Sequence, residues 1–176
     1  MTSSEDVERQ VRDTVHAERD AYTGGSDHPL GGYLGAMGVY AASVAALAAA
    51  ARLAGRPLPE PTVWDLALCT GATHRLSRLL AKDPVTSPLR APFTRFEGTT
   101  GPAELKEGVR GSGARKAVGE LLTCPFCTGV WIATGLSAGL VFAPRATRLA
   151  ALTLTALAGS DLLQFARVRI QRAAGE

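Results

Sequence analysis

Two cysteines are the residues whose type and spacing most directly suggest chemistry in this sequence. Cys124 and Cys127 form a Cys-Pro-Phe-Cys motif at the head of an apolar run, in the segment GELLTCPFCTGVWIA over residues 119–133. Thiols at this spacing can supply half of a tetrahedral zinc site. They can also cycle between dithiol and disulfide, or pack as small apolar side chains. The motif alone leaves these three interpretations open.

A metal site would need ligands from elsewhere in the chain, because a second Cys-x-x-Cys pair is absent from the sequence. Zinc or iron held by Cys124 and Cys127 would require further ligands, and the candidates are His74, Asp161 and Glu120. Alternatively, two copies of the chain could each donate one cysteine pair across a homo-oligomer.

A thiol reaction would use the start of a helix. We expect Thr123 to cap that helix and Pro125 to lie in its first turn, where backbone N–H groups stabilise a thiolate. An oxidase that passes electrons to a quinone through two cysteine pairs is not expected, because Cys69 is the only other cysteine. In the structural interpretation, Pro125 kinks the junction between a short interfacial helix over residues 115–123 and the apolar run.

Four apolar segments position these residues, at residues 31–51, 63–80, 121–143 and 147–166. Three of them carry almost no charge over about 20 residues, which is the length that crosses a bilayer. The second segment holds Asp65, His74, Arg75 and Arg78. We therefore expect that segment to be buried among the other three. The sequence predicts an all-α integral membrane bundle of four transmembrane helices.

The distribution of basic residues predicts the direction of the four helices. If all four cross, the leader, the loop over residues 81–120 and the C-terminal tail share one side with 13 Lys and Arg, against 4 in the two short turns. Basic residues are enriched on the cytoplasmic side of membrane proteins. Both termini and the cysteine pair are therefore expected at the cytoplasmic face of a bacterial inner membrane, where a stable disulfide is not expected.

Charged side chains within the bundle are expected to pair near that same face. Ionisable groups inside a membrane are costly and are usually paired. The predicted directions bring four such residues to one level, namely Arg75, Arg78, Glu120 and Asp161. We predict a buried ion pair between one of these arginines and one of these carboxylates. The alternative is that the arginines reach the lipid headgroups.

The Pro-rich basic loop between the second and third segments is expected to meet the membrane surface. Pro84, Pro88 and Pro92 recur every fourth residue and forbid a continuous helix. Basic and aromatic side chains occur among them and just beyond, at Arg90, Phe93, Arg95 and Phe96. This combination suits an anionic lipid surface, and the alternative is that the aromatic rings tuck under the bundle. The Gly-rich residues 98–116 are expected to be mobile.

Small residues recur at every fourth position in two of the segments, and they predict close helix contacts. The first segment has Gly31 and Gly35, then Gly38, Ala42, Ala46 and Ala50; the third has Gly129, Ala133 and Ser137.

The sequence divides into a polar leader over residues 1–28, a membrane domain over residues 29–166 and a basic tail over residues 167–176. Valines at every fourth position predict a helix within the leader, over residues 4–22. The net charge of +3 and the absence of a basic module interleaved with aromatic residues argue against nucleic-acid binding. The long charged leader is unlike a secretory signal peptide.

Three stretches together resemble a bacterial membrane-protein family. They are an Arg-Leu-x-Arg-Leu run from Arg75, Asp-Pro-Val-Thr-x-Pro-Leu-Arg from Asp83, and Cys-Pro-x-Cys-x-Gly-x-Trp from Cys124. Over about residues 62–167 the chain resembles the domain of unknown function 1360 family, which includes YjcA-like sporulation proteins. The resemblance implies an integral membrane protein and carries no assigned activity. We therefore expect a small, non-enzymatic protein of the lipid bilayer that acts through a membrane protein partner or self-association. The alternative is a metal-binding or thiol-redox protein that uses Cys124 and Cys127.

Overall fold

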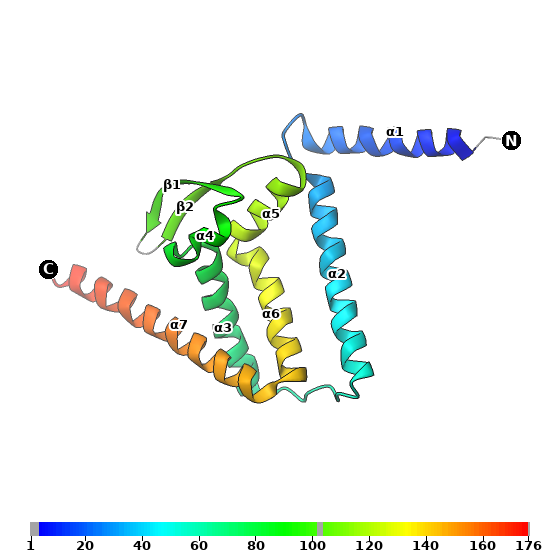
Figure 1. Ribbon diagram of the computed structural model, residues 1–176. Helices are drawn as coiled ribbons and strands as arrows, with labels where there is room; N and C mark the ends of the chain where they lie inside the picture. The colour runs from blue at the N-terminus through cyan, green and yellow to red at the C-terminus, as the bar shows by residue number, and fades with distance from the viewer. Residues whose placement is uncertain (1–3, 102–103, 176) are drawn as a thin grey trace.

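The computed structural model describes residues 4–101 and 104–175. It consists of long helices and one small two-stranded sheet (Figure 1). Residues 1–3 of the leader, 102–103 of the loop and 176 of the tail lie outside the described residues. Along the chain the elements are α1 (Ser4–Thr23), α2 (Leu30–Leu53), α3 (Val63–Ala81), the 3-10 turn η1 (Pro84–Thr86), α4 (Ser87–Arg90), β1 (Thr94–Gly101), β2 (Glu104–Val109), α5 (Gly113–Thr123), α6 (Pro125–Phe142) and α7 (Pro144–Ala173).

Three of the helices are long and apolar enough to cross a membrane, namely α2, α6 and α7. All four expected segments are helical, but length and composition support a crossing for only these three. The charges of α3, at Asp65, Arg75 and Arg78, are spread along the helix, so its longest uncharged stretch is shorter than those within α2, α6 and α7. Three helices of this length and composition indicate a membrane protein, and the crossing of α3 stays a prediction.

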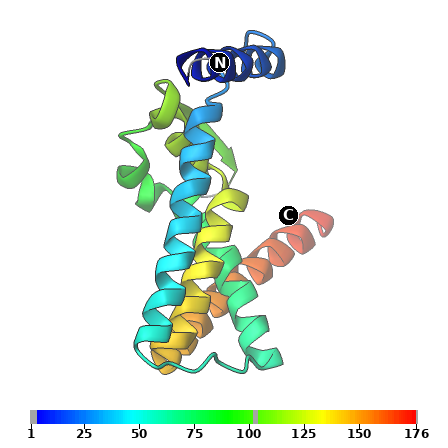
Figure 2. The same cartoon turned by 90° about the vertical axis from the view of Figure 1, so that its right-hand side faces the viewer.

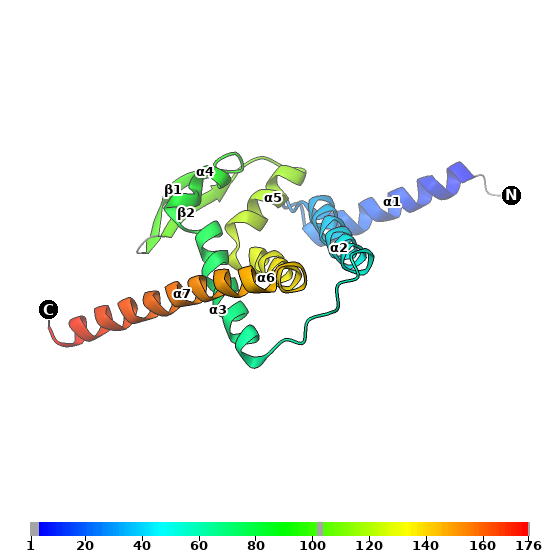
Figure 3. The ribbon, with the colours of Figure 1, turned by 60° about the horizontal axis from the view of Figure 1, so that its bottom comes forward.

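The axes of α2, α3 and α6 are roughly aligned, with α3 running opposite to the other two, whereas α7 leaves the lower end of the bundle at a slant (Figures 1 and 3). Viewed from the side, α2 and α6 stand together and α1 lies across the upper end of α2 (Figure 2). None of the residues of α1 is buried. Its valines Val7, Val11 and Val15 are exposed. The expected tail is not a separate part, because α7 continues as one helix to Ala173.

The helices α3 and α7 cross closely at a glycine. A Cβ atom placed on Gly71 would lie 2.6 Å from Cγ2 of Thr155, and the Thr155 hydroxyl donates a 2.7 Å hydrogen bond to the carbonyl of Leu68. The small-residue stripe of α2 behaves differently, because a Cβ on Gly31, Gly35 or Gly38 would meet nothing within 4 Å. The expected contact through these three glycines is therefore wrong within this single chain, since they face away from the bundle.

The described part of the loop between α3 and α6 folds into a unit of its own, which we call the cap (residues 82–101 and 104–123). Its strands β1 and β2 pair as an antiparallel hairpin, with Thr94 opposite Val109 and Phe96 opposite Glu107. A bulge follows Phe96, where Gly98 takes the left-handed φ of 130°. The all-α prediction is wrong here, as is the prediction of a mobile stretch for the described part of residues 98–116. Backbone pairing across the hairpin satisfies polar groups that an open loop would leave to water.

Candidate functional site

Arg90 is the centre of the polar network in the cap, and it is the largest fully buried side chain among the described residues. Its Nε forms an ion pair with the carboxylate of Glu107. Its Nη1 donates hydrogen bonds to the Leu80 carbonyl at 2.7 Å and to the Thr86 hydroxyl at 2.8 Å. Its Nη2 donates to the Asp83 carbonyl at 3.1 Å. One guanidinium therefore joins the end of α3, the turn η1 and the strand β2.

The surface role predicted for Arg90 is therefore wrong. The last carbonyls of a helix lack partners within that helix, and Arg90 supplies donors to the chain where α3 ends. Of the other three residues predicted to meet lipid, Phe93 is half-buried and Arg95 is exposed. Phe96 is 64% exposed. Only Arg95 and Phe96 therefore remain open to a membrane or a partner.

Two further arginines fasten the turn that follows α4. The Nη2 of Arg110 donates to the Ala91 carbonyl at 2.7 Å. The Nη2 of Arg115 donates to the Pro92 carbonyl at 2.5 Å. In the sequence both arginines stand out only as basic residues of the loop. A proline-rich turn leaves backbone carbonyls that need donors, but the spacing of the arginines does not indicate which carbonyls they bind.

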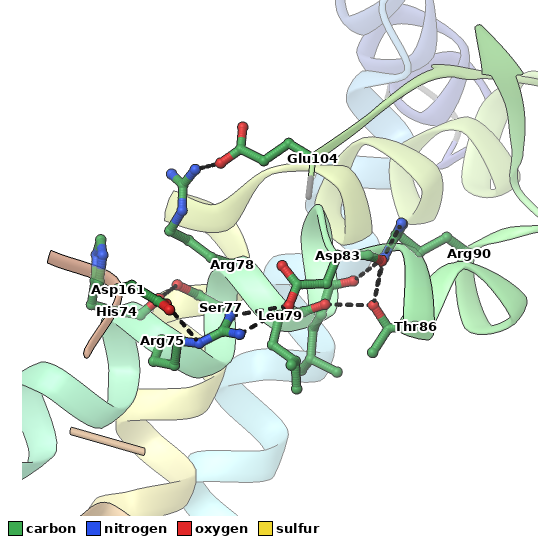
Figure 4. A network of polar contacts seen from close by, with 11 residues as sticks. His74, Arg75, Ser77, Arg78, Leu79, Asp83, Thr86, Arg90, Glu104 and Asp161 are labelled. Atoms are coloured by element: carbon green, nitrogen blue, oxygen red, sulfur yellow. Dashed lines mark hydrogen bonds and ion pairs between the residues drawn. The ribbon is translucent and has the colours of Figure 1, made fainter. Parts of the chain in front are cut away.

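Arg75 connects α3 to both the cap and α7 (Figure 4). Its Nη1 and Nη2 each donate a 3.1 Å hydrogen bond to Oδ2 of Asp83. Its Nε lies 3.1 Å from Oδ2 of Asp161. This second contact is an ion pair without a directed hydrogen bond, because Nε is buried and has no acceptor in line. The Asp161 side chain remains 44% exposed, so the pair lies at the edge of the bundle.

The other two residues of the predicted charge group have separate partners. Arg78 forms an ion pair with Glu104 of β2 (Figure 4). Glu120 of α5 accepts a hydrogen bond from the Tyr33 hydroxyl of α2. The four residues thus take part in four contacts, to Asp83, between Arg75 and Asp161, to Glu104 and to Tyr33, and each contact joins a different pair of segments.

A further charge pair, between Asp65 and Arg148, lies at the opposite end of α3. Asp65 Oδ1 is 2.7 Å from Nε of Arg148, and Oδ2 is 3.0 Å from Nη2. Asp65 also completes a capping box with Thr62 at the start of α3. This pair was not predicted from the sequence. The second and fourth segments both begin at the same end of the expected bundle, and this is the feature that could have indicated the pair.

The cysteine pair lies where α5 ends and α6 begins. Cys124 has an extended backbone, with φ −101° and ψ 106°, and it is the residue that caps α6. Its Sγ accepts a 3.2 Å hydrogen bond from the backbone N–H of Cys127. Thr123, the predicted cap, instead donates its hydroxyl to the Gly119 carbonyl at 2.9 Å. The expected break before Pro125 is confirmed, and both thiols are free.

The predicted metal ligands do not come together. Across residues 4–101 and 104–175, no three His, Cys, Asp or Glu side chains are grouped closely enough to hold a metal ion. Asp161 is turned to Arg75, and His74 is exposed on α3. The set of Cys124, Cys127, His74 and Asp161 is therefore wrong as a zinc or iron site within one chain, because these residues lie on, or at the start of, three different helices and their side chains are not grouped.

An apolar pocket of about 380 Å³ opens beside Cys127 between α2 and α6. Its walls include Met37 and Tyr40 of α2 and Trp131 of α6. The Tyr40 and Trp131 rings meet edge to face, with centroids 5.1 Å apart and planes at 77°. The Tyr40 hydroxyl is 2.9 Å from the Thr134 hydroxyl, which fixes the ring.

A second hollow, of about 400 Å³, lies in the cap. Pro88, Ala91, Phe96 and Leu105 provide its apolar lining, and Thr94 and Glu107 provide polar atoms. Glu107 is held by Arg90, so the buried ion pair forms part of the floor of this hollow.

Comparisons with known proteins give the chain its family. No solved structure matches it. The sporulation protein YjcA of Bacillus subtilis (strain 168) is 37% identical over 97 residues, which cover 53% of this chain and 81% of that protein. The family model described as a protein of unknown function (DUF1360) matches residues 68–167, which include the cap, the cysteine pair and most of α7. The chain therefore belongs to the DUF1360 family.

Proposed function

We propose that this chain is an integral protein of the bacterial cytoplasmic membrane that acts by binding a partner protein at its cap. In this proposal the helices α2, α3, α6 and α7 all cross, and both termini and the cap lie in the cytoplasm. The excess of basic residues on that side, 13 against 4, supports this direction.

The observation that carries the proposal is the rigid hollow above the Arg90–Glu107 pair. Burying a charged pair is costly and often contributes no net stability. Here the pair fixes a surface on which Phe96 stands 64% exposed at the rim of the hollow. Exposed aromatic residues on a preorganised surface are typical anchors of protein interfaces. Arg95 precedes Phe96 in β1 and is also exposed, so the strand presents one basic and one aromatic side chain.

The relative from Bacillus subtilis is named as a sporulation protein. We extend that setting to this chain as part of the proposal, with a partner that belongs to the same process. The matched region contains the whole cap, which is consistent with a shared surface.

A photo-crosslinking amino acid placed at Phe96 tests the proposal in living cells. We expect a discrete crosslinked product that carries one other protein, identified by mass spectrometry. The control position is Arg56, an exposed residue in the turn between α2 and α3 at the other end of the bundle. The product should be lost when Arg90→Ala is added, because the hollow then has no fixed floor. The same product from Phe96 and Arg56, or no product from Phe96, would refute partner binding at the cap.

A second candidate function is thiol chemistry at Cys124 and Cys127. The hydrogen bond from the Cys127 N–H to Cys124 Sγ favours it, because it holds the two cysteines side by side at the start of α6. The dispersed ligands disfavour a metal site within one chain. This function requires that the two thiols form a disulfide reversibly while the chain is folded.

A further inference from the structure

We infer that the apolar pocket beside Cys127 binds a membrane quinone, and that this quinone oxidises the Cys124–Cys127 dithiol. The inference rests on the second candidate function and names its electron acceptor. The first reason is location. The pocket lies between α2 and α6, which are both apolar enough to cross a membrane. A lipid-soluble molecule can therefore enter it from the bilayer, whereas a water-soluble oxidant must approach from the cytoplasm.

The walls of the pocket suit a flat ring. Its volume of about 380 Å³ is within the usual range for small-molecule sites. Trp131 and Tyr40 place two fixed aromatic rings in the lining, and the flexible thioether of Met37 lies beside them. Aromatic side chains favour stacked or edge-on contacts with another ring. A saturated acyl chain would gain nothing specific from this geometry.

The thiol is the reactive group on that wall. Cys127 lines the pocket, and Cys124 lies three residues earlier with its sulfur on the Cys127 N–H. In the oxidation, the two S–H bonds break and one S–S bond forms. Two electrons and two protons pass to the quinone, whose carbonyl oxygens become the hydroxyl groups of a hydroquinone. The step balances without a second cysteine pair, so the absence of one does not exclude it.

The position of the cysteine pair also allows the disulfide to be reduced again. In the proposed topology the junction of α5 and α6 lies at the cytoplasmic end of the bundle. Cytosolic thiols keep exposed cysteines reduced, and a thiolate restores a dithiol by exchange through a mixed disulfide. Cys127 is exposed. The ratio of dithiol to disulfide would then follow the oxidation state of the membrane quinones.

Oxidation by a short-chain ubiquinone tests the inference on the purified full-length chain carrying Cys69→Ser. Each ring carbon of this quinone that is not a carbonyl carries a substituent other than hydrogen, so thiols cannot add there. The reaction is run without oxygen in lipid nanodiscs. Loss of quinone absorbance and a maleimide gel shift report the two halves of the reaction. We expect one hydroquinone for each disulfide formed, and no disulfide in Cys127→Ser.

Matched variants test the contribution of the pocket separately from the reactivity of the thiols. Ala41 lines the pocket and the adjacent Ala42 does not. Ala41→Phe should slow oxidation by ubiquinone about tenfold or more, the scale on which filling a pocket alters selectivity, and Ala42→Phe should leave the rate unchanged. Diamide, a small water-soluble thiol oxidant, should oxidise both variants at the same rate as the parent chain.

The outcomes distinguish the inference from the function on which it rests. If diamide forms no Cys124–Cys127 disulfide, thiol chemistry itself is refuted. If diamide forms the disulfide and ubiquinone does not, only the quinone is refuted. If Ala41→Phe reacts with ubiquinone as fast as Ala42→Phe, the quinone does not act from this pocket and the inference is wrong.

Discussion

At the scale of single residues, one arginine holds the cap to the membrane helices. Arg90 bonds to Leu80, which lies in the last turn of α3, and to Glu107 in β2. These two residues lie 27 positions apart in the sequence. The guanidinium has five donors in a planar fork, and the chain directs four bonds from it to four separate residues. The shape of the cap therefore depends on one buried charge and its partners.

Replacing Arg90 should loosen the cap without unfolding the helices. Arg90→Ala leaves the buried Glu107 carboxylate without its cationic partner and with only the Thr94 hydroxyl as a donor, at 3.4 Å. Losing one partner of a buried ion pair costs about 3–5 kcal/mol. Arg90→Lys should not restore the loss, because an ammonium lacks the planar fork. Limited proteolysis should cut both variants between residues 82 and 112 at rates well above the parent chain.

Two comparisons make this expectation specific. Arg95→Ala removes an exposed arginine of the same cap and should leave the cleavage rate unchanged. The double substitution Arg90→Met with Glu107→Leu removes both charges and should recover part of the stability. Equal protection of Arg90→Ala and the parent chain would mean that the buried pair does not hold the cap.

At the scale of elements, α3 is the one helix of α2, α3, α6 and α7 that is not apolar enough to count as a candidate span, and three of its charged side chains are paired. Its first turn holds Asp65 against Arg148 of α7. Its later turns hold Arg75 against Asp161 of α7 and Asp83 of the cap. Charged groups that are paired in this way lose much of the penalty of leaving water. The helix is therefore suited to a position between α7 and α6, and away from lipid.

The crossing of α3 and α7 should be sensitive to one methyl group. Gly71→Ala would place Cβ 2.6 Å from Cγ2 of Thr155, so the helices must separate. Separation should weaken the Thr155 to Leu68 hydrogen bond and lower the melting temperature in detergent.

The matched change is Gly35→Ala in α2, where a Cβ meets nothing within 4 Å. This variant should melt at or above the temperature of the parent chain, because Ala favours a helix over Gly. A similar melting temperature for both variants would show that α3 and α7 do not pack through Gly71.

At the scale of the whole molecule, the cap and both termini should share one side of the membrane. The cap lies at the upper end of the bundle in Figure 1, and the turn between α2 and α3 lies at the lower end. This arrangement agrees with the side that the basic residues indicate. It holds only if α3 crosses the bilayer together with α2, α6 and α7.

Cysteine labelling tests that arrangement in whole cells. In a chain without its three native cysteines, we expect Arg56→Cys to react with a membrane-impermeant maleimide added outside. Thr100→Cys, at an exposed position of β1, should react only after the cells are opened. Labelling of both positions from outside would mean that α3 does not cross and that the cap is external.

The sequence by itself determined where the long helices lie and which prolines open two of them. Proline after Cys124 and Ala143 opens α6 and α7, because proline fits the first turn of a helix and breaks its interior. Uncharged runs of about 20 residues indicate membrane helices because lipid cannot solvate polar side chains. The directions of the helices alone also predicted that Arg75 and Asp161 lie at the same height along the bundle. The structure brings these two residues together.

Only the tertiary structure decided what the polar residues of the loop do. Arg90 and Arg95 look alike in the sequence, yet Arg90 is fully buried and Arg95 is exposed. The difference depends on Glu107 and on the free carbonyls at the end of α3, which the hairpin brings to Arg90 through contacts distant in sequence. The same reason explains why Cys124, Cys127, His74 and Asp161 share no metal site. Periodicity assigns a residue to a level of a helix, whereas packing determines which neighbour its side chain faces.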